Sequence, residues 1–320
     1  MKKRLVMSHD LPGQPDKKAR SEGWDVVVPE RGGRMSRVGL LSEVKEAFAL
    51  VTLLSDRVDT ELLDAAPRLK IVANYAVGYD NIDLSACKER GIVVTNTPDV
   101  LTEATADLTW ALLLGSARRL VEGHRLVSRG EYQGWAPHLL LGQDVGGRVL
   151  GIFGAGRIGR AVAERSVGFG MKVLYTDSYP WEEGEKRLGA KRVAWEELLE
   201  QSDFLSLHAP LLPDTEKVMN RDAFSRMKPT AILINAARGG LVDEDALLEA
   251  LDKGELFGAG LDVYDPEPPL QSNPLLKHPR IVLAPHLGSA SVGVREEMGR
   301  LVIENILAVW EGRPPLTPVG

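Results

Sequence analysis

The chain has 320 residues, enough for about two domains with separate hydrophobic cores. Its hydrophobic content of 44% and its charged content of 26% are ordinary for a globular protein. The net charge of -6, from 39 basic and 45 acidic residues, argues against a nucleic-acid partner, since such a surface usually needs a basic excess.

The cysteine count and the N-terminus bear on the compartment. Cys87 is the only cysteine, so an intrachain disulfide is impossible, which suits a reducing cytoplasm. The basic start is followed by the short apolar run Leu5–Met7, too short for a signal-peptide core, and no run is long enough to span a membrane. We therefore expect a cytoplasmic protein without a membrane partner.

Short apolar runs alternate with helical patterns through residues 5–94, which predicts a parallel sheet in a first α/β domain. The expected strands are Leu5–Met7, Val26–Val28, Leu50–Leu54, Ile71–Asn74 and Ile92–Val94, and the expected helices are Val38–Ala47, Glu61–Ala66 and Leu84–Arg90.

The loop Asn74–Asp83 directly follows the fourth of these strands. Ligands of open α/β sheets lie beyond the carboxyl ends of strands, and the amides around Val77 and Gly78 could hold a small anion there. An ordinary turn that uses Gly78 and Asn81 explains the same spacing equally well.

A hinge-like Asn96-Thr97-Pro98 precedes one long predicted helix, Leu101–Ser128. The loop Gly130–Gly147 follows, with the aromatic residues Tyr132 and Trp135. This loop could pack on a partner subunit or cap its own domain, and composition does not decide between the two.

The stretch Val149–Asp177 predicts a dinucleotide-binding unit. It consists of a strand Val149–Phe153, a glycine turn, a helix Arg157–Gly168, a strand Met171–Thr176 and an acidic residue. Within the turn, Gly154 makes the bend, Gly156 lets the backbone approach a pyrophosphate, and Gly159 allows the helix to pack closely on the strand. The helix N-terminus offers N–H groups to phosphates. A glycine-rich turn without a ligand is the alternative.

Asp177 favours NAD over NADP. Its carboxylate would accept hydrogen bonds from the ribose hydroxyls of the cofactor, whereas a 2′-phosphate would meet a like charge. The next residue is Ser178 rather than an arginine that could bind such a phosphate.

The alternation of strands and helices continues to the C-terminus, with Asp243 as a predicted N-cap. The expected helices are Trp195–Gln201, Arg221–Met227, Glu244–Leu251 and Val292–Trp310, and the expected strands are Phe204–Leu207, Thr230–Ile234, Gly258–Val263 and Ile281–Leu283.

Three polar residues fall just beyond the carboxyl ends of strands in the second domain: Arg238, Glu267 and His286. An arginine offers a rigid fork to a carboxylate, and a histidine exchanges protons near neutral pH. A glutamate on the imidazole would fix its tautomer and stabilise its charged form. Each residue alone could be an ordinary loop side chain, but their joint position beside a nicotinamide site favours catalysis.

The chain resembles the D-isomer-specific 2-hydroxyacid dehydrogenases along its whole length, and within them the glyoxylate/hydroxypyruvate reductases. The motifs that carry this resemblance are Gly154–Gly159 with Asp177, His208-Ala209-Pro210, Asn235–Gly239, Asp262-Val263-Tyr264 with Glu267-Pro268, Pro285–Ser289, Asn74–Asp80 and Thr97–Thr102.

The resemblance implies two Rossmann-like or flavodoxin-like, doubly wound parallel-sheet domains with a cleft between them. Residues 1–99 plus 288–320 would form a discontinuous substrate-binding domain, and residues 100–287 would form the NAD-binding domain. The implied reaction is NADH-dependent reduction of a small 2-oxo acid in a homodimer, with His286 as the general acid and base.

The resemblance also implies site residues, without a metal. The implied catalytic residues are Arg238, Glu267 and His286. The implied cofactor-binding residues are Gly154, Gly156, Arg157, Ile158, Gly159, Asp177, His208, Ala209, Pro210, Thr215, Ala236, Arg238, Asp262, His286, Gly288 and Thr105. The implied substrate-binding residues are Val77, Gly78, Leu54, Arg238, Ser289 and Trp135. Of these, Trp135 would reach the active site of the neighbouring subunit.

Other functions remain open from the sequence. Phosphoglycerate, phosphite and D-lactate dehydrogenases share the family's motifs, although phosphite enzymes carry a lysine in the anion loop where this chain has Asn74-Tyr75-Ala76. A non-catalytic NAD-sensing protein on the same fold would retain the same three polar residues.

Overall fold

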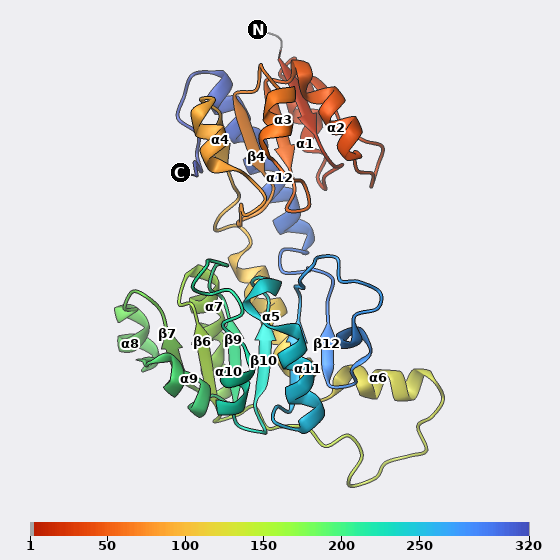
Figure 1. Cartoon of the computed structure of the whole chain (residues 1–320), viewed down its shortest axis with the longest axis vertical. Coiled ribbons are helices and arrows are strands. Elements are labelled where there is room, and N and C mark those ends of the chain that lie inside the picture. The colour runs from red at the N-terminus through yellow and green to blue at the C-terminus, as the bar shows by residue number, and fades with distance from the viewer. Residues whose placement is uncertain (1–2, 320) are drawn as a thin grey trace. The chain divides into compact units, whose positions relative to one another are not determined.

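The computed structural model describes residues 3–319, and the contacts of the chain divide it into two compact units (Figure 1). Unit 1 comprises Met1–Leu101 and Ser289–Gly320, and unit 2 comprises Thr102–Gly288. Each unit is built on one sheet whose strands are all parallel, with helices packed against it. The expected fold class, two doubly wound parallel-sheet domains, is confirmed.

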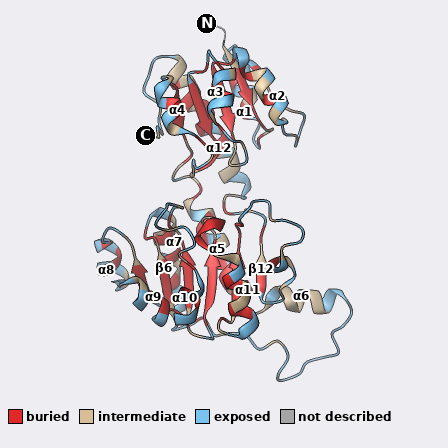
Figure 2. Ribbon diagram, in the orientation of Figure 1, coloured by how far each residue is buried: buried red, intermediate tan, exposed pale blue. Residues whose placement is uncertain are grey.

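The sheet of unit 1 has the strand order β2-β1-β3-β4-β5, which is the flavodoxin-like order. Its three central strands are almost wholly buried, as Figure 2 shows, because helices cover both faces. The order reverses between β1 and β3, so the carboxyl ends of these two strands mark the place where such a sheet offers a crevice. The strands are β1 (Arg4–Met7), β2 (Asp25–Val27), β3 (Ala49–Thr52), β4 (Ile71–Asn74) and β5 (Val93–Thr95).

Three of the helices of unit 1 begin at side-chain caps that the sequence supplies. Ser36, Asp59 and Asp83 each accept a hydrogen bond from a backbone N–H in the first turn of the helix that follows. The helices are α1 (Pro15–Ser21), α2 (Arg37–Glu43), α3 (Thr60–Ala65), α4 (Leu84–Glu89) and α12 (Val292–Trp310), with a 3-10 turn η1 (Val44–Glu46) after α2.

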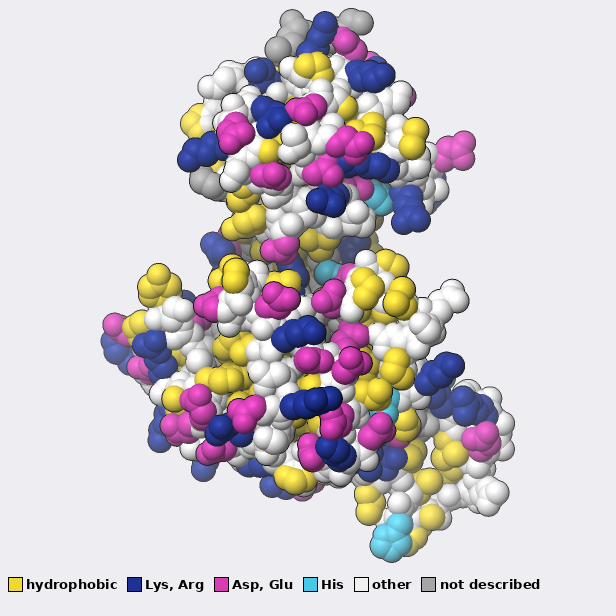
Figure 3. All heavy atoms as spheres, in the orientation of Figure 1, with side chains coloured by type: hydrophobic (Ala, Val, Ile, Leu, Met, Phe, Trp, Pro, Cys, Tyr) yellow, Lys and Arg dark blue, Asp and Glu magenta, His cyan; other side chains and the backbone are white. Residues whose placement is uncertain are grey.

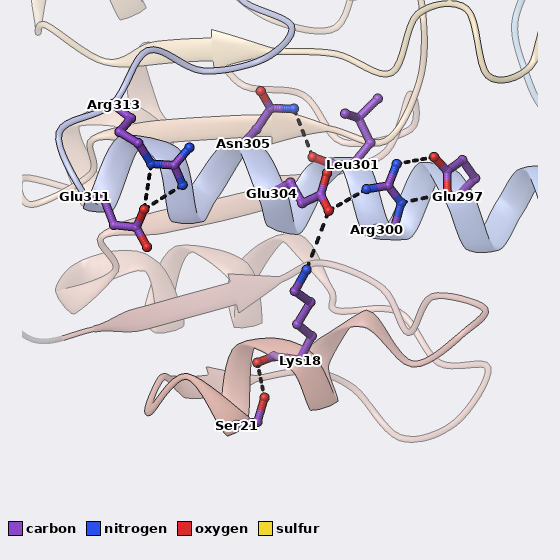
Figure 4. Close-up of polar contacts among 9 residues, drawn as sticks. All are labelled: Lys18, Ser21, Glu297, Arg300, Leu301, Glu304, Asn305, Glu311 and Arg313. Carbon is purple, nitrogen blue, oxygen red and sulfur yellow. Dashed lines mark hydrogen bonds and ion pairs between the residues drawn. The ribbon is translucent and has the colours of Figure 1, made fainter.

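The last helix, α12, returns to the first unit and packs on α1 and β4. Lys18 of α1 forms an ion pair of 3.5 Å with Glu304 of α12 (Figure 4). At the end of α12, Trp310 packs edge-on against Trp24 and Phe48, with ring centroids 5.4 and 4.8 Å away. Aromatic contacts of this kind contribute about 1 kcal/mol each beyond the area that they bury, so they hold the end of α12 in the unit.

The sheet of unit 2 has the order β12-β11-β10-β9-β6-β7-β8. The chain starts in the middle at β6, runs outward through β7 and β8, and then returns to β9 on the other side. The switch point therefore lies between β6 and β9. The strands are β6 (Val149–Phe153), β7 (Lys172–Thr176), β8 (Lys191–Arg192), β9 (Phe204–Leu207), β10 (Ile232–Asn235), β11 (Gly258–Leu261) and β12 (Ile281–Leu283).

The single helix expected over Leu101–Ser128 is wrong, since the chain forms α5 (Thr102–Ala117) and then α6 (Leu120–Ser128). Arg119 between them has a φ of 52°, a left-handed conformation that ends a helix. The freed carbonyl of Ala117 accepts a hydrogen bond of 2.8 Å from the amide of Gln143. Neither glycine nor proline marks this break, so the sequence carried no local signal for it.

The remaining helices of unit 2 cover its sheet. They are α7 (Arg157–Arg165), α8 (Glu182–Leu188), α9 (Trp195–Gln201), α10 (Arg221–Arg226) and α11 (Glu244–Lys253), with 3-10 turns η2 (Ser166–Phe169), η3 (Gly239–Leu241) and η4 (Pro274–Lys277). The predicted N-cap of α11 is confirmed, because Asp243 accepts a hydrogen bond of 3.2 Å from the amide of Ala246.

Residues 129–148 form a long segment without helix or strand that extends from the body of unit 2 (Figure 1). Trp135 in this segment is 83% exposed and Leu141 is 59% exposed. On the face of the molecule that Figure 3 draws, acidic and basic side chains are interspersed. Among residues 3–319, no helix combines the length and the apolar character that crossing a membrane requires.

Candidate functional site at the carboxyl ends of the unit 2 strands

The glycine turn after β6 lies at the switch point of the sheet. Gly154 has a φ of 94°, and a Cβ at this position would lie 2.6 Å from the amide nitrogen of Ala209 in the loop after β9. A Cβ at Gly159 would lie 2.1 Å from the carbonyl oxygen of Gly154. At Gly156 nothing lies within 4 Å of such a Cβ. Two glycines therefore permit close packing within the protein, and the third leaves open space where a ligand could approach the backbone.

Helix α7 starts at this turn, and its N-cap is Gly156, which is in extended conformation and has no side chain to cap the helix. Arg157 is its first residue, and Ile158 packs against the core beneath. An N-terminus of this kind suits a diphosphate, because it combines N–H groups with the positive end of the helix dipole.

Asp177 follows β7 and is tied to the glycine turn. Its carboxylate accepts hydrogen bonds from the amides of Ala155 (2.7 Å) and Tyr179 (2.9 Å). Arg192 of β8, which no sequence motif marks as a site residue, donates to the backbone carbonyls of Asp177 (2.7 Å) and Ser178 (3.0 Å). The charge at this edge is therefore mixed, with an aspartate and an arginine side by side.

The loop after β9 forms the other wall of the switch point. The amide of His208 donates to the carbonyl of Phe153, at 2.7 Å, and so joins this loop to the end of β6. Burial lowers the pKa of His208 to about 3, so its imidazole stays neutral near pH 7. The Thr215 hydroxyl donates to the carbonyl of Pro210, at 2.7 Å, and closes the loop.

Arg238 lies in the loop after β10, which a buried asparagine shapes. The side chain of Asn235 donates to the carbonyl of Arg238 (2.8 Å) and accepts from the amide of Ala237 (3.1 Å). Gly239 lies directly against the next loop, since a Cβ there would be 2.0 Å from the backbone of Tyr264. Ala236 in the same loop is half-buried.

Glu267 and His286 form a hydrogen-bonded pair, with 2.5 Å between Oε1 of the glutamate and Nδ1 of the imidazole. Burial alone would raise the pKa of Glu267, but the hydrogen bond and charge of His286, the Tyr264 amide and the Arg238 guanidinium together lower it. The carboxylate is thus ionised at neutral pH. Because its Nδ1 contacts the glutamate, His286 has Nε2 available for another partner.

Asp262 holds the segment that carries His286. Its side chain is buried, and its two carboxylate oxygens accept from the amides of Leu287 (2.6 Å) and Gly288 (2.8 Å). Its backbone carbonyl accepts from the amide of His286, at 2.9 Å. Burial raises the pKa of Asp262, opposed by the amide of Leu287. Thr105 of α5 lies beside the same turn, 3.3 Å from where a Cβ on Gly288 would sit.

His286 itself has a φ of 54°, in the left-handed region. Non-glycine residues adopt this conformation at a cost of about 1 kcal/mol or more, and they persist in it where surrounding contacts impose it. The hydrogen bonds to Asp262 supply those contacts. The side chain of His286 is therefore aimed by a backbone that the protein holds in place.

In unit 1, the loop Asn74–Asp83 begins at the carboxyl end of β4. Val77 and Gly78 are half-buried, and the carbonyl of Gly78 accepts from the side chain of Asn74, at 2.8 Å. Leu54 lies in the turn after β3, which the side chain of Asn81 holds through hydrogen bonds to the carbonyls of Leu53 (3.0 Å) and Asp56 (2.9 Å). The two loops are thus connected within the unit.

Two more of the expected substrate-binding residues are Ser289 and Trp135. Ser289 is the first residue of the C-terminal part of unit 1, and its carbonyl accepts from Arg295, at 3.3 Å. Trp135 lies in the segment 129–148, which has no helix or strand, and its side chain is 83% exposed. Among the described residues, no group of three or more His, Cys, Asp and Glu could hold a metal ion.

Known proteins resemble the chain over its whole length. The profile of the "D-isomer specific 2-hydroxyacid dehydrogenase, NAD binding domain" matches residues 110–288. A glyoxylate reductase of Thermococcus onnurineus is 48% identical, with 100% of this chain and 96% of that protein covered. A glyoxylate reductase of Thermococcus kodakarensis is 50% identical, with 93% and 91% covered.

Solved structures share the fold as well. A crystal structure of a Thermus thermophilus protein has a TM-score of 0.93 and 48% identity, and covers 99% of this chain and 100% of that one. The NADPH-dependent glyoxylate/hydroxypyruvate reductase of Sinorhizobium meliloti, in complex with NADP and malonate, has a TM-score of 0.88 and 36% identity, with 100% and 97% covered.

Proposed function

The chain belongs to the D-isomer-specific 2-hydroxyacid dehydrogenases, and from this premise we propose that it is an NAD(P)-dependent oxidoreductase that reduces glyoxylate or hydroxypyruvate to the 2-hydroxy acid. The observation that carries the proposal is the Glu267–His286 hydrogen bond, beside Arg238, at the carboxyl ends of β10, β11 and β12. Relatives named glyoxylate reductase, at 46–50% identity, support the choice of substrate.

His286 acts as the general acid in the reduction. Its Nδ1 is held by Glu267, so Nε2 delivers the proton to the oxygen on C2 of the 2-oxo acid. Glu267 stabilises the imidazolium before transfer and selects the nitrogen that faces the substrate. In the reverse reaction, the neutral imidazole takes the proton back.

Arg238 binds the substrate carboxylate and polarises the C2 carbonyl. A guanidinium suits this task because its fork matches a carboxylate and keeps its charge at every relevant pH. The negative charge on the C2 oxygen grows during the reaction, so the arginine and the imidazolium stabilise the transition state more than the ground state. The amides of Val77 and Gly78, together with Leu54 and Ser289, contribute the remaining substrate contacts in this proposal.

The nicotinamide cofactor, when bound, supplies the hydride that reduces C2. The amides at the start of α7 and the open backbone at Gly156 hold its diphosphate. Asp177 accepts hydrogen bonds from the ribose hydroxyls of the adenosine half and repels a 2′-phosphate, so NADH is preferred over NADPH. Arg192 beside Asp177 weakens that repulsion and makes the preference partial.

The enzyme works as a homodimer in this proposal, in the cytoplasm and without a nucleic-acid or membrane partner. Support comes from large apolar side chains exposed on α6 and the segment after it: Leu120 (67%), Val127 (61%), Trp135 (83%) and Leu141 (59%). Trp135 reaches the active site of the partner subunit. Sedimentation should give a mass of two chains, and Trp135→Ala should raise the KM for the 2-oxo acid.

The test is consumption of NADH and of NADPH, measured side by side with glyoxylate and with hydroxypyruvate. We expect turnover with NADH that His286→Gln reduces by about 10³-fold, in the range that loss of acid–base catalysis produces, while NADH still binds. Full turnover in His286→Gln would reject the assignment of the acid. Absence of turnover with every cofactor and substrate pair would reject the function.

A further inference from the structure

Two carbonyl groups of the loop after β4 are fixed by hydrogen bonds from within unit 1. The carbonyl of Ala76 accepts from the amide of Thr97 (2.8 Å), and the carbonyl of Val77 accepts from the side chain of Asn96 (2.8 Å). In a trans peptide, the C=O of one residue and the N–H of the next point in opposite directions. Fixing these two carbonyls therefore fixes the directions of the N–H groups of Val77 and Gly78.

The N–H groups of Val77 and Gly78 donate to no protein acceptor among the described residues of the chain. Two adjacent amides that are oriented but not used make a small anion site. Asn96 orients the second of them, because its side chain holds the Val77–Gly78 peptide.

Asn96 is in turn attached to the C-terminal tail. Its backbone carbonyl accepts from the hydroxyl of Thr317 (2.7 Å), and its amide donates to the carbonyl of Thr317 (3.3 Å). The tail continues beside β5, where the amide of Val319 donates to the carbonyl of Val94, at 2.9 Å.

A buried asparagine on α12 holds the tail in this place. Asn305 is fully buried, and its Oδ1 accepts from the amides of Leu316 (2.8 Å) and Thr317 (3.1 Å). Its Nδ2 donates to the hydroxyl of Thr317 and to the carbonyl of Leu301, each at 2.9 Å (Figure 4 shows the latter bond). All hydrogen-bonding groups of this side chain are satisfied, as a buried amide requires.

We propose that Asn96 is a positioning residue for the substrate carboxylate, and that Asn305 and Thr317 place it through the C-terminal tail. The relay Asn305–Thr317–Asn96–Val77 presents the N–H of Gly78 to the anion. It rests on the proposed function, in which the carboxylate binds these amides. Residues at the end of the chain thus determine the affinity for the substrate without contacting it.

The test uses Thr317→Val, which removes the hydroxyl and keeps the shape, and Thr317→Ser, which keeps the hydroxyl. Asn96→Ala removes the last step of the relay. Asn220→Ala is the matched control, because it deletes an N-cap of α10 in unit 2 and lowers stability only. For each variant, we would measure the KM for glyoxylate and for NADH, the Kd of oxamate with NADH present, and the Tm.

We expect Asn96→Ala to raise the KM for glyoxylate and the Kd of oxamate about fivefold, the factor that one net hydrogen bond contributes. Thr317→Val should raise these two constants by a smaller factor, and Thr317→Ser should keep them near the wild-type values. The KM for NADH should stay constant throughout. If Asn96→Ala and Thr317→Val lower the Tm as Asn220→Ala does but leave both constants at the wild-type values, the relay is refuted. A wild-type protein that turns over no 2-oxo acid would instead refute the proposed function itself.

Discussion

Replacement of Glu267 by glutamine tests the catalytic pair most directly. Glu267→Gln keeps the size of the side chain and removes its charge. In the native protein, the pKa of Glu267 is lowered because the bond and charge of His286 outweigh burial. By reciprocity, the ionised carboxylate stabilises the protonated imidazole. The variant therefore lacks the charge that holds the protonated imidazole for proton transfer.

The size of the effect follows from the geometry. A hydrogen bond of 2.5 Å to an ionised group contributes about 1.5–3 kcal/mol. The side chains of His286 and Glu267 remain 33% and 38% exposed, so solvent screening places this pair near the lower end. About 1.4 kcal/mol corresponds to a factor of ten in rate.

The assay is kcat/KM for reduction and for oxidation at neutral pH. In reduction, which uses the protonated imidazole, Glu267→Gln should lower kcat/KM about tenfold, because the charge that stabilises the imidazolium is gone. In oxidation the imidazolium forms as the proton is taken up, so we expect a similar loss. Glu244→Gln is the control, since Glu244 lies near the same loop and accepts from the amide of Asp265, at 3.0 Å, rather than from His286. A native kcat/KM in Glu267→Gln would refute the pairing.

Three further changes probe the same unit. Asp262→Asn should reduce kcat at least about tenfold, as rapid-quench kinetics would measure. The NH₂ group of the asparagine must face the N–H of either Leu287 or Gly288, so one of the two hydrogen bonds that hold this segment is lost. Folding raises the pKa of Asp262, so the free energy of unfolding of the native protein should fall as the pH rises above 3.8, the ordinary pKa of the group. Denaturant titrations of Asp262→Asn should lack this contribution to the fall. Asp177→Ala should shift the ratio of kcat/KM for NADH to kcat/KM for NADPH towards NADPH. Without the carboxylate, the 2′-phosphate of NADPH is no longer repelled and lies beside the positive charge of Arg192. An unchanged ratio would show that Asp177 does not select the cofactor. Gly154→Ala should lower the free energy of unfolding by more than about 1 kcal/mol, because of the φ of 94° and a 2.6 Å approach to Ala209, as urea denaturation would measure.

Regular patterns of buried apolar residues determined which elements could be predicted from the sequence. The strands β4, β6, β9 and β12 have the predicted bounds, and so do α9 and α12. These segments are buried on one or both faces, so hydrophobic burial decides both their position and their type.

Elements with little apolar surface escaped prediction. Only Pro15 and Ala19 of α1 are buried, and both residues of β8 are exposed. The break at Arg119 depends on Gln143, which is distant in sequence. In such places, tertiary contacts decide the structure, and local pattern does not report them.

The same division applies to the site. The positions of Arg238, Glu267 and His286 beyond strand ends could be predicted because each follows a recognisable strand. The supports around them could not, since Asp262 acts through amides of residues that lie far along the chain. Asn96 and Arg192 act on backbone carbonyls, for which the sequence contains no signal.

The return of α12 to unit 1 has a consequence for synthesis. Unit 2 is continuous in sequence, so it can fold as soon as residues 102–288 have left the ribosome. Unit 1 must wait, because Trp24 and Phe48 meet Trp310 only when the last helix arrives. We expect a nascent chain shortened before residue 289 to leave these rings exposed to chaperones and proteases, and limited proteolysis would reveal it. The loop that presents Gly78 is made early, yet it acquires its final conformation last, when Asn305 and Thr317 take their places.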